Sequence, residues 1–140
     1  MKMPKLNVKL LDRILRHVKK EPRRFDMGQW VDSSVTAPCG TAACLAGWAV
    51  ILGDPKGNTK AVRAKFIHLA NNQNGGTPDT STIFKRAMKA LGLTYDEAKG
   101  MFLTYTGEYG QAAAQTAEQK IALIKTDRQA FVEKYGSYGS

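Results

Sequence analysis

The segment from Pro38 to Leu52 constrains the fold more than any other part of the chain. It holds both cysteines and then an apolar run that ends at a Gly-Asp-Pro turn. Thr41 is well placed to cap a helix, and no charged side chain occurs between Thr41 and Leu52. A helix that is apolar nearly all round is stable when it is buried. We therefore expect a central, buried helix from Thr41 to about Leu52.

The N-terminal segment, residues 7–20, has the pattern of an amphipathic helix. Basic residues lie on one side of this helix, and apolar residues recur at helical spacing on the other. The apolar residues are Val8, Leu10, Leu11, Ile14, Leu15 and Val18. Asn7 can cap the start of this helix. Glu21 precedes a proline, which pushes it out of the helical region and ends the helix.

Five further helices are predicted, over residues 59–70, 81–91, 95–102, 111–125 and 128–134. The clearest boundary is at Thr94, because Glu97 three residues later completes a capping box. No segment alternates apolar and polar residues over a convincing length. We therefore expect an all-α fold, a compact bundle of about five to seven helices around the central apolar helix.

The length and composition indicate one domain. A chain of 140 residues with 43% hydrophobic content can bury a sizeable core without staples, so we expect a single helical domain over residues 1–135 and a flexible tail over 136–140. Two cysteines do not make a disulfide framework. With neither a membrane-spanning stretch nor a secretory leader in this sequence, we expect a cytoplasmic protein and no membrane partner.

The charge of the chain is concentrated near its start. Residues 1–24 contain nine basic and two acidic side chains and so carry +7 of the net charge of +9. This pattern favours an acidic partner such as nucleic acid, a nucleotide or an acidic protein surface; the alternative is a solubilising face. The preferred contact residues are Lys9, Arg13, Arg16, Lys20, Arg23 and Arg24, followed by Lys60, Arg63 and Lys65.

Three blocks of the sequence resemble a group of small uncharacterised proteins from tailed phages and bacteria, built around a Cys-Gly-Thr-x-x-Cys-x-Ala-Gly-Trp core. The blocks are Phe25–Trp30, Cys39–Ala49 and Ala90–Ala98. The resemblance implies a phage or mobile-element setting, a compact helical domain and action on host machinery or host defence. It brings no established activity and no assigned catalytic residues.

Three kinds of chemistry are conceivable around the two cysteines. Cys39 or Cys44, near a helix start, could act as the nucleophile of a cysteine-dependent hydrolase or transferase, with His17 or His68 as its base. The same four residues could bind zinc, although their spacing differs from that of zinc sites. The third alternative is an anion site on the first turn of the helix: Gly40, Thr41, Ala42 and Ala43.

Simple packing is the competing interpretation of the cysteines, since a buried thiol behaves as a small core residue. Neither histidine has an evident orienting partner in the sequence, which weakens the catalytic alternative. We therefore expect a protein that works by binding an acidic partner through its basic surface, without catalysis and without a metal or cofactor.

Overall fold

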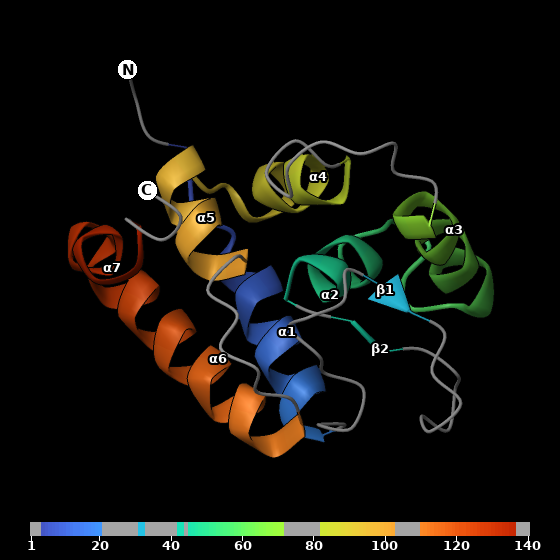
Figure 1. Ribbon diagram of the computed structural model, residues 1–140, viewed down its shortest axis with the longest axis horizontal. Coiled ribbons are helices and arrows are strands. Elements are labelled where there is room, and N and C mark those ends of the chain that lie inside the picture. Colours follow the sequence, from blue (N-terminus) through green and yellow to red (C-terminus); the bar gives the residue numbers. More distant parts are fainter. Residues whose placement is uncertain are drawn as a thin grey trace.

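Seven helices make up most of the residues that this computed structural model describes, namely 4–20, 31–32, 42–43, 45–71, 82–102 and 110–136 (Figure 1). They are α1 (Val8–Lys20), α2 (Leu45–Leu52), α3 (Lys60–Asn71), α4 (Thr82–Leu91), α5 (Tyr95–Phe102), α6 (Gly110–Thr126) and α7 (Arg128–Tyr135). The all-α class predicted from the sequence is confirmed. None of the described helices is long and apolar enough to cross a membrane.

One short strand pair interrupts the helical pattern. β1 (Val31–Asp32) pairs antiparallel with β2 (Ala42–Ala43), with Val31 opposite Ala43. The prediction that the apolar helix starts at Thr41 is therefore wrong, because α2 begins at Leu45. Alanine favours helices, but here pairing with a segment eleven residues away in sequence outweighs that local preference.

The apolar composition of α2 accounts for its burial. All eight of its residues are buried, and the helix contacts α1, α3, α4 and α5. Trp48 has no exposed surface and belongs to one continuous apolar cluster with side chains such as Ile14 and Phe84. Removing a large side chain of this kind from water stabilises the fold by about 1.5–3 kcal/mol.

The amphipathic pattern predicted α1 to within one residue. Asn7 Oδ1 accepts a hydrogen bond from the amide of Leu10 at 3.1 Å, which is the predicted cap. The buried face consists of Leu10, Leu11, Ile14 and Val18. Val8 was predicted on this face but is 41% exposed, because at 100° per residue it lies about 100° from the centre of the buried arc.

The second half of the chain follows its capping signals. The Thr94 amide donates to Glu97 Oε1 at 2.8 Å and the Glu97 amide donates to Thr94 Oγ1 at 3.3 Å, which confirms the predicted capping box at the start of α5. Asp127 separates α6 from α7 and accepts a hydrogen bond from the amide of Ala130. α6 runs beside α1, and α7 packs on both α5 and α6 (Figure 1).

Candidate cationic binding surface

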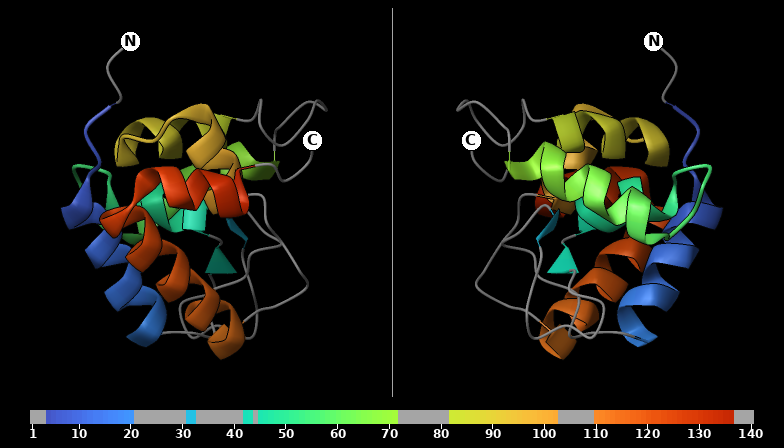
Figure 2. Two further views of the ribbon diagram at one scale, coloured as in Figure 1. Left: turned by 90° about the vertical axis from the view of Figure 1, so that its left-hand side faces the viewer. Right: turned by 90° about the vertical axis from the view of Figure 1, so that its right-hand side faces the viewer.

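Four basic side chains form a row on the outer face of α1. Lys9, Arg13, Arg16 and Lys20 are all exposed, and at 100° per residue they fall within an arc of about 60°. At 1.5 Å per residue the row is about 16 Å long. α1 lies at the outer edge of the molecule in both views of Figure 2. We call these four residues the α1 stripe.

Two other charged residues of α1 form ion pairs with α6. Lys19 Nζ lies 2.6 Å from Glu118 Oε2, and Lys125 Nζ lies 2.7 Å from Asp12 Oδ1. Within the described residues, no member of the α1 stripe makes an ion pair. Arg13 Nη1 donates to the carbonyl of Leu52 at the end of α2, at 3.1 Å, where a cation also complements the helix dipole.

Two open hollows, each of about 460 Å³, adjoin the start of the α1 stripe. They share Asn7, Lys9 and Ala90 in their walls. The first continues along Arg13 and the turn after α2, and the second continues along Lys5 and Lys89. We call the two hollows together the α1–α4 furrow. Its described lining therefore carries cations from both helices and from the segment that precedes α1.

The acidic residue of the furrow is already engaged. Asp54 Oδ1 accepts a hydrogen bond from the amide of Lys56 at 2.9 Å. Its other carboxylate oxygen lies 3.6 Å from Lys65 Nζ. Because Asp54 is partly neutralised in this way, the cations of the furrow determine its electrostatic character.

Asn7 holds one wall of the furrow against the other. Besides capping α1, it donates through Nδ2 to the carbonyl of Ala90 at 3.0 Å, and its backbone amide donates to the carbonyl of Leu91 at 2.9 Å. The positive end of α1 thus meets the negative end of α4. Residues 4–7, which we call the N-terminal strap, are tied to α4 by these bonds.

Gly92 allows the strap to approach this closely. Its φ is +70°, a conformation that side chains rarely adopt. A Cβ atom built on it would also lie 2.0 Å from the backbone carbonyl oxygen of Lys5. Both the turn after α4 and the position of the strap therefore require glycine here.

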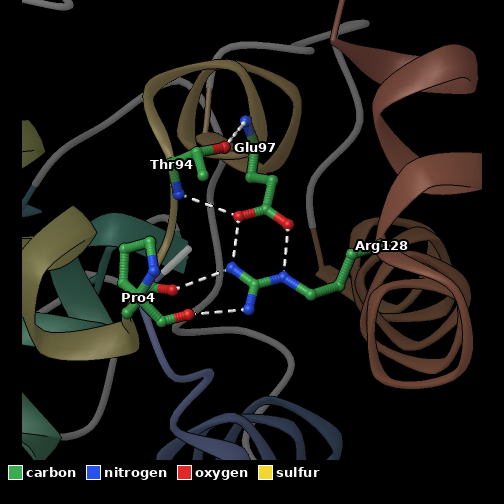
Figure 3. Close-up of polar contacts among 5 residues, drawn as sticks. Pro4, Thr94, Glu97 and Arg128 are labelled. Atoms are coloured by element: carbon green, nitrogen blue, oxygen red, sulfur yellow. Dashed lines mark hydrogen bonds and ion pairs between the residues drawn. The ribbon is translucent and has the colours of Figure 1, made fainter. Parts of the chain in front are cut away.

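A buried ion pair fixes the far end of the strap (Figure 3). Arg128 donates through Nε to Glu97 Oε2 and through Nη2 to Glu97 Oε1, both at 2.6 Å. The same guanidinium donates to the carbonyls of Pro4 at 2.8 Å and Gly92 at 3.0 Å. One side chain of α7 thus joins α5, the turn after α4 and the strap.

The environment of Glu97 keeps it ionised. Burial acts to raise the pKa of this fully buried carboxyl, but the hydrogen bonds from Arg128 and Thr94 and the positive charge of Arg128 bring the pKa below its ordinary value. The two parallel bonds of the guanidinium are the strong geometry for such a pair. This ion pair organises the fold and presents no open acid or base for chemistry.

The structure describes some of the predicted contact residues. The four members of the α1 stripe are exposed together, and Lys60 and Lys65 are exposed on α3, with Arg63 partly exposed. Arg63 Nη1 donates to the side chain and carbonyl of Asn58. Arg23 and Arg24 lie outside the described residues.

The anion site was predicted on the assumption that its residues form the first turn of a helix, and this assumption is wrong for the two residues that the structure describes. Ala42 and Ala43 form β2, and the helix behind them starts at Leu45, so these two residues are not in the first turn of a helix. Gly40 and Thr41 lie outside the described residues. Anion binding by this segment stays a prediction without its helix-dipole basis.

The catalytic and zinc alternatives depend on residues that the structure describes only in part. His17 is half-buried on α1, with its ring centroid 4.2 Å from that of Trp48, and His68 is exposed on α3. Cys39 and Cys44 lie outside the described residues. Within the described ranges no cluster of three or more His, Cys, Asp or Glu side chains is suited to a metal ion.

Sequence reasoning missed the furrow and the ion pair. Lys5 and Lys89 are far apart in the chain, and neither was singled out as a contact residue. Glu97 was recognised as a helix-capping residue, but its partner Arg128 was seen only as the start of the last helix. The capping box gave a signal, since a buried cap carboxylate calls for a cation.

Comparison with known proteins gives this chain no relative. No protein-family model matches it, and no curated protein and no solved structure matches it either. Its function is therefore argued from the surface described above.

Proposed function

We propose that the protein binds nucleic acid through the phosphate backbone, with no chemical step, and that the α1 stripe is its main contact. The observation that carries this proposal is the division of charges on α1: Lys19 and Asp12 pair with α6, while four cations stand together in the solvent. A row of this kind fits a partner whose negative charges are also in a row.

The dimensions of the stripe match a nucleic-acid strand. It is about 16 Å long, and phosphates follow one another at about 3.4 Å per strand along the axis of a duplex. Four lysine and arginine side chains over this length can therefore each meet a separate phosphate. Such contacts position a protein on nucleic acid without reading its sequence.

The resemblance to small phage and bacterial proteins supports a setting for this binding. We propose that the partner is nucleic acid of a host cell or of its defence machinery, and that the protein acts by occupying it. This setting rests on the resemblance, whereas the binding mode rests on the α1 stripe.

Two charge-matched variants test the proposal. Arg16→Gln with Lys20→Gln removes two members of the stripe, and Lys99→Gln with Lys134→Gln removes two cations from α5 and α7. We expect the stripe variant to bind a labelled duplex at least about tenfold more weakly at about 0.1 M salt, while the control binds like the unmodified chain. Equal affinity of the two variants, measured by fluorescence anisotropy, contradicts the proposed contact surface.

A further inference from the structure

We infer that the α1–α4 furrow holds one sugar–phosphate strand of a nucleic-acid duplex. This inference rests on the proposed function and adds the class of ligand and a second contact region. Lys9 and Arg13 belong to both the α1 stripe and the lining of the furrow. A strand that follows the stripe towards the start of α1 therefore enters the furrow and remains in contact with basic side chains throughout.

The charges of the furrow are complementary to a phosphate strand. Lys5, Lys9 and Lys89 are exposed, and none makes an ion pair with another described residue. Lys5 and Lys9 come from the strap and α1, whereas Lys89 comes from α4. A strand between these elements therefore meets positive charge on both sides.

The size and lining of the furrow suit the sugar–phosphate backbone of a duplex better than a single strand with exposed bases. Each hollow, at about 460 Å³, has the volume of a small-ligand site, which suits a short length of one sugar–phosphate strand while the other strand of the duplex lies outside. Single-strand binders add aromatic side chains on which bases stack. The described lining of the two hollows contains no aromatic residue, and Trp48, Phe66 and Phe84 on the adjoining helices are buried. These features favour a duplex, whose bases stay stacked inside.

The furrow is organised before a ligand arrives. The strap that carries Lys5 is held by Asn7, by the close approach at Gly92 and by the bond from Arg128 to Pro4. A wall fixed in this way loses little conformational freedom when a strand binds. The ties to α4 and α7 thus position a binding residue as well as stabilising the fold.

The test compares Lys5→Gln with Lys89→Gln, which changes the furrow alone, with the stripe variant and with the Lys99→Gln, Lys134→Gln control. Each variant loses two positive charges. For the furrow variant on a duplex we expect affinity to fall about tenfold or more at about 0.1 M salt, and the slope of log K against log salt to become shallower by about 1.8. The unmodified chain should bind the duplex more tightly than a single strand of the same length.

The outcomes separate this inference from the proposed function. If the furrow variant binds like the control while the stripe variant is weakened, the furrow inference is overturned and the proposed function stands. If the unmodified chain prefers the single strand, the duplex assignment is overturned. If it binds neither ligand, the proposed function fails. Circular dichroism checks that each variant is folded, and Lys89→Glu alone replaces the double variant if that loses helicity, with the same expected loss of binding.

Discussion

Two glycines with nearly the same backbone conformation have different surroundings. Gly57 has a φ of +77° and Gly92 a φ of +70°. A Cβ atom on Gly57 would meet nothing within 4 Å, whereas one on Gly92 would meet the carbonyl oxygen of Lys5. A difference in the effect of the same substitution at the two positions therefore measures how tightly the strap is packed.

We expect Gly57→Ala to lower the free energy of unfolding by about 1–2 kcal/mol, the cost of the left-handed conformation. Gly92→Ala should cost about 2 kcal/mol more, because the strap has to move away from the new methyl group. Urea unfolding of both variants measures this difference. Equal costs would show that the strap does not pack against Gly92 in solution.

The buried ion pair makes stability depend on acidity. The pKa of Glu97 is lowered from the ordinary value of 4.5 in the folded protein, so the pair stabilises the fold above about pH 4.5 and this contribution disappears as the pH falls through the lowered pKa. Glu97→Gln should lower the free energy of unfolding by about 2 kcal/mol at neutral pH. This is less than the loss expected on breaking a fully buried ion pair, because the side chain of Arg128 is 22% exposed.

The difference in unfolding free energy between Glu97→Gln and the unmodified chain should therefore shrink as the solution is acidified below pH 4.5. Glu133→Gln, at an exposed position of α7, is the matched control and should change stability little. Urea unfolding at a series of pH values measures all three chains. A difference that stays constant down to the acid limit would show that Glu97 is not held ionised by Arg128.

At the scale of the elements, the junction of α1 and α4 depends on the dual role of Asn7. Both Asn7 and Thr59 cap a helix through a side-chain oxygen, but only Asn7 among these two also donates to another helix. Thr59→Asp should be nearly neutral, since aspartate is a good cap. Asn7→Asp should cost about 1–2 kcal/mol, because it keeps the cap but loses the bond to Ala90.

The new carboxylate of Asn7→Asp also repels the carbonyl oxygens of Ala90 and Leu91, which lowers stability further. Thermal or urea unfolding of the two aspartate variants measures the difference between them. If both variants unfold at the same denaturant concentration, the side chain of Asn7 does not join the helices. The junction would then depend on the strap backbone alone.

Features that depend on residues close together in the sequence could be predicted, whereas features that depend on contacts between separate segments could not. The starts of α1 and α5 were predicted to within one residue from their caps, because Asn7 and Thr94 act on amides three positions away. The start of α3 was also predicted to within one residue, although Thr59 was not recognised as its cap. The start of α2 was missed, because Ala42–Ala43 pairs with a distant segment. The furrow was missed for the same reason, since Lys5 and Lys89 meet only in the folded chain.

For the whole molecule, the arrangement of charge on α1 separates packing from binding. The ion pairs of Lys19 and Asp12 with α6 are partly exposed, and exposed pairs contribute about 0–1 kcal/mol each. The buried leucines and isoleucine of α1 therefore hold the helix in place. Of the α1 stripe, Arg13 donates to the carbonyl of Leu52, and no member forms an ion pair within the described residues, which leaves the charges of the stripe available for a ligand.

The salt dependence of duplex binding by the unmodified chain tests the central claim most directly. Four stripe contacts and two furrow contacts predict a slope of log K against log salt of about −5 between about 50 and about 200 mM salt. Fluorescence anisotropy on a labelled duplex gives this slope. A slope shallower than about −2, or no binding at the lowest salt concentration, would contradict the account.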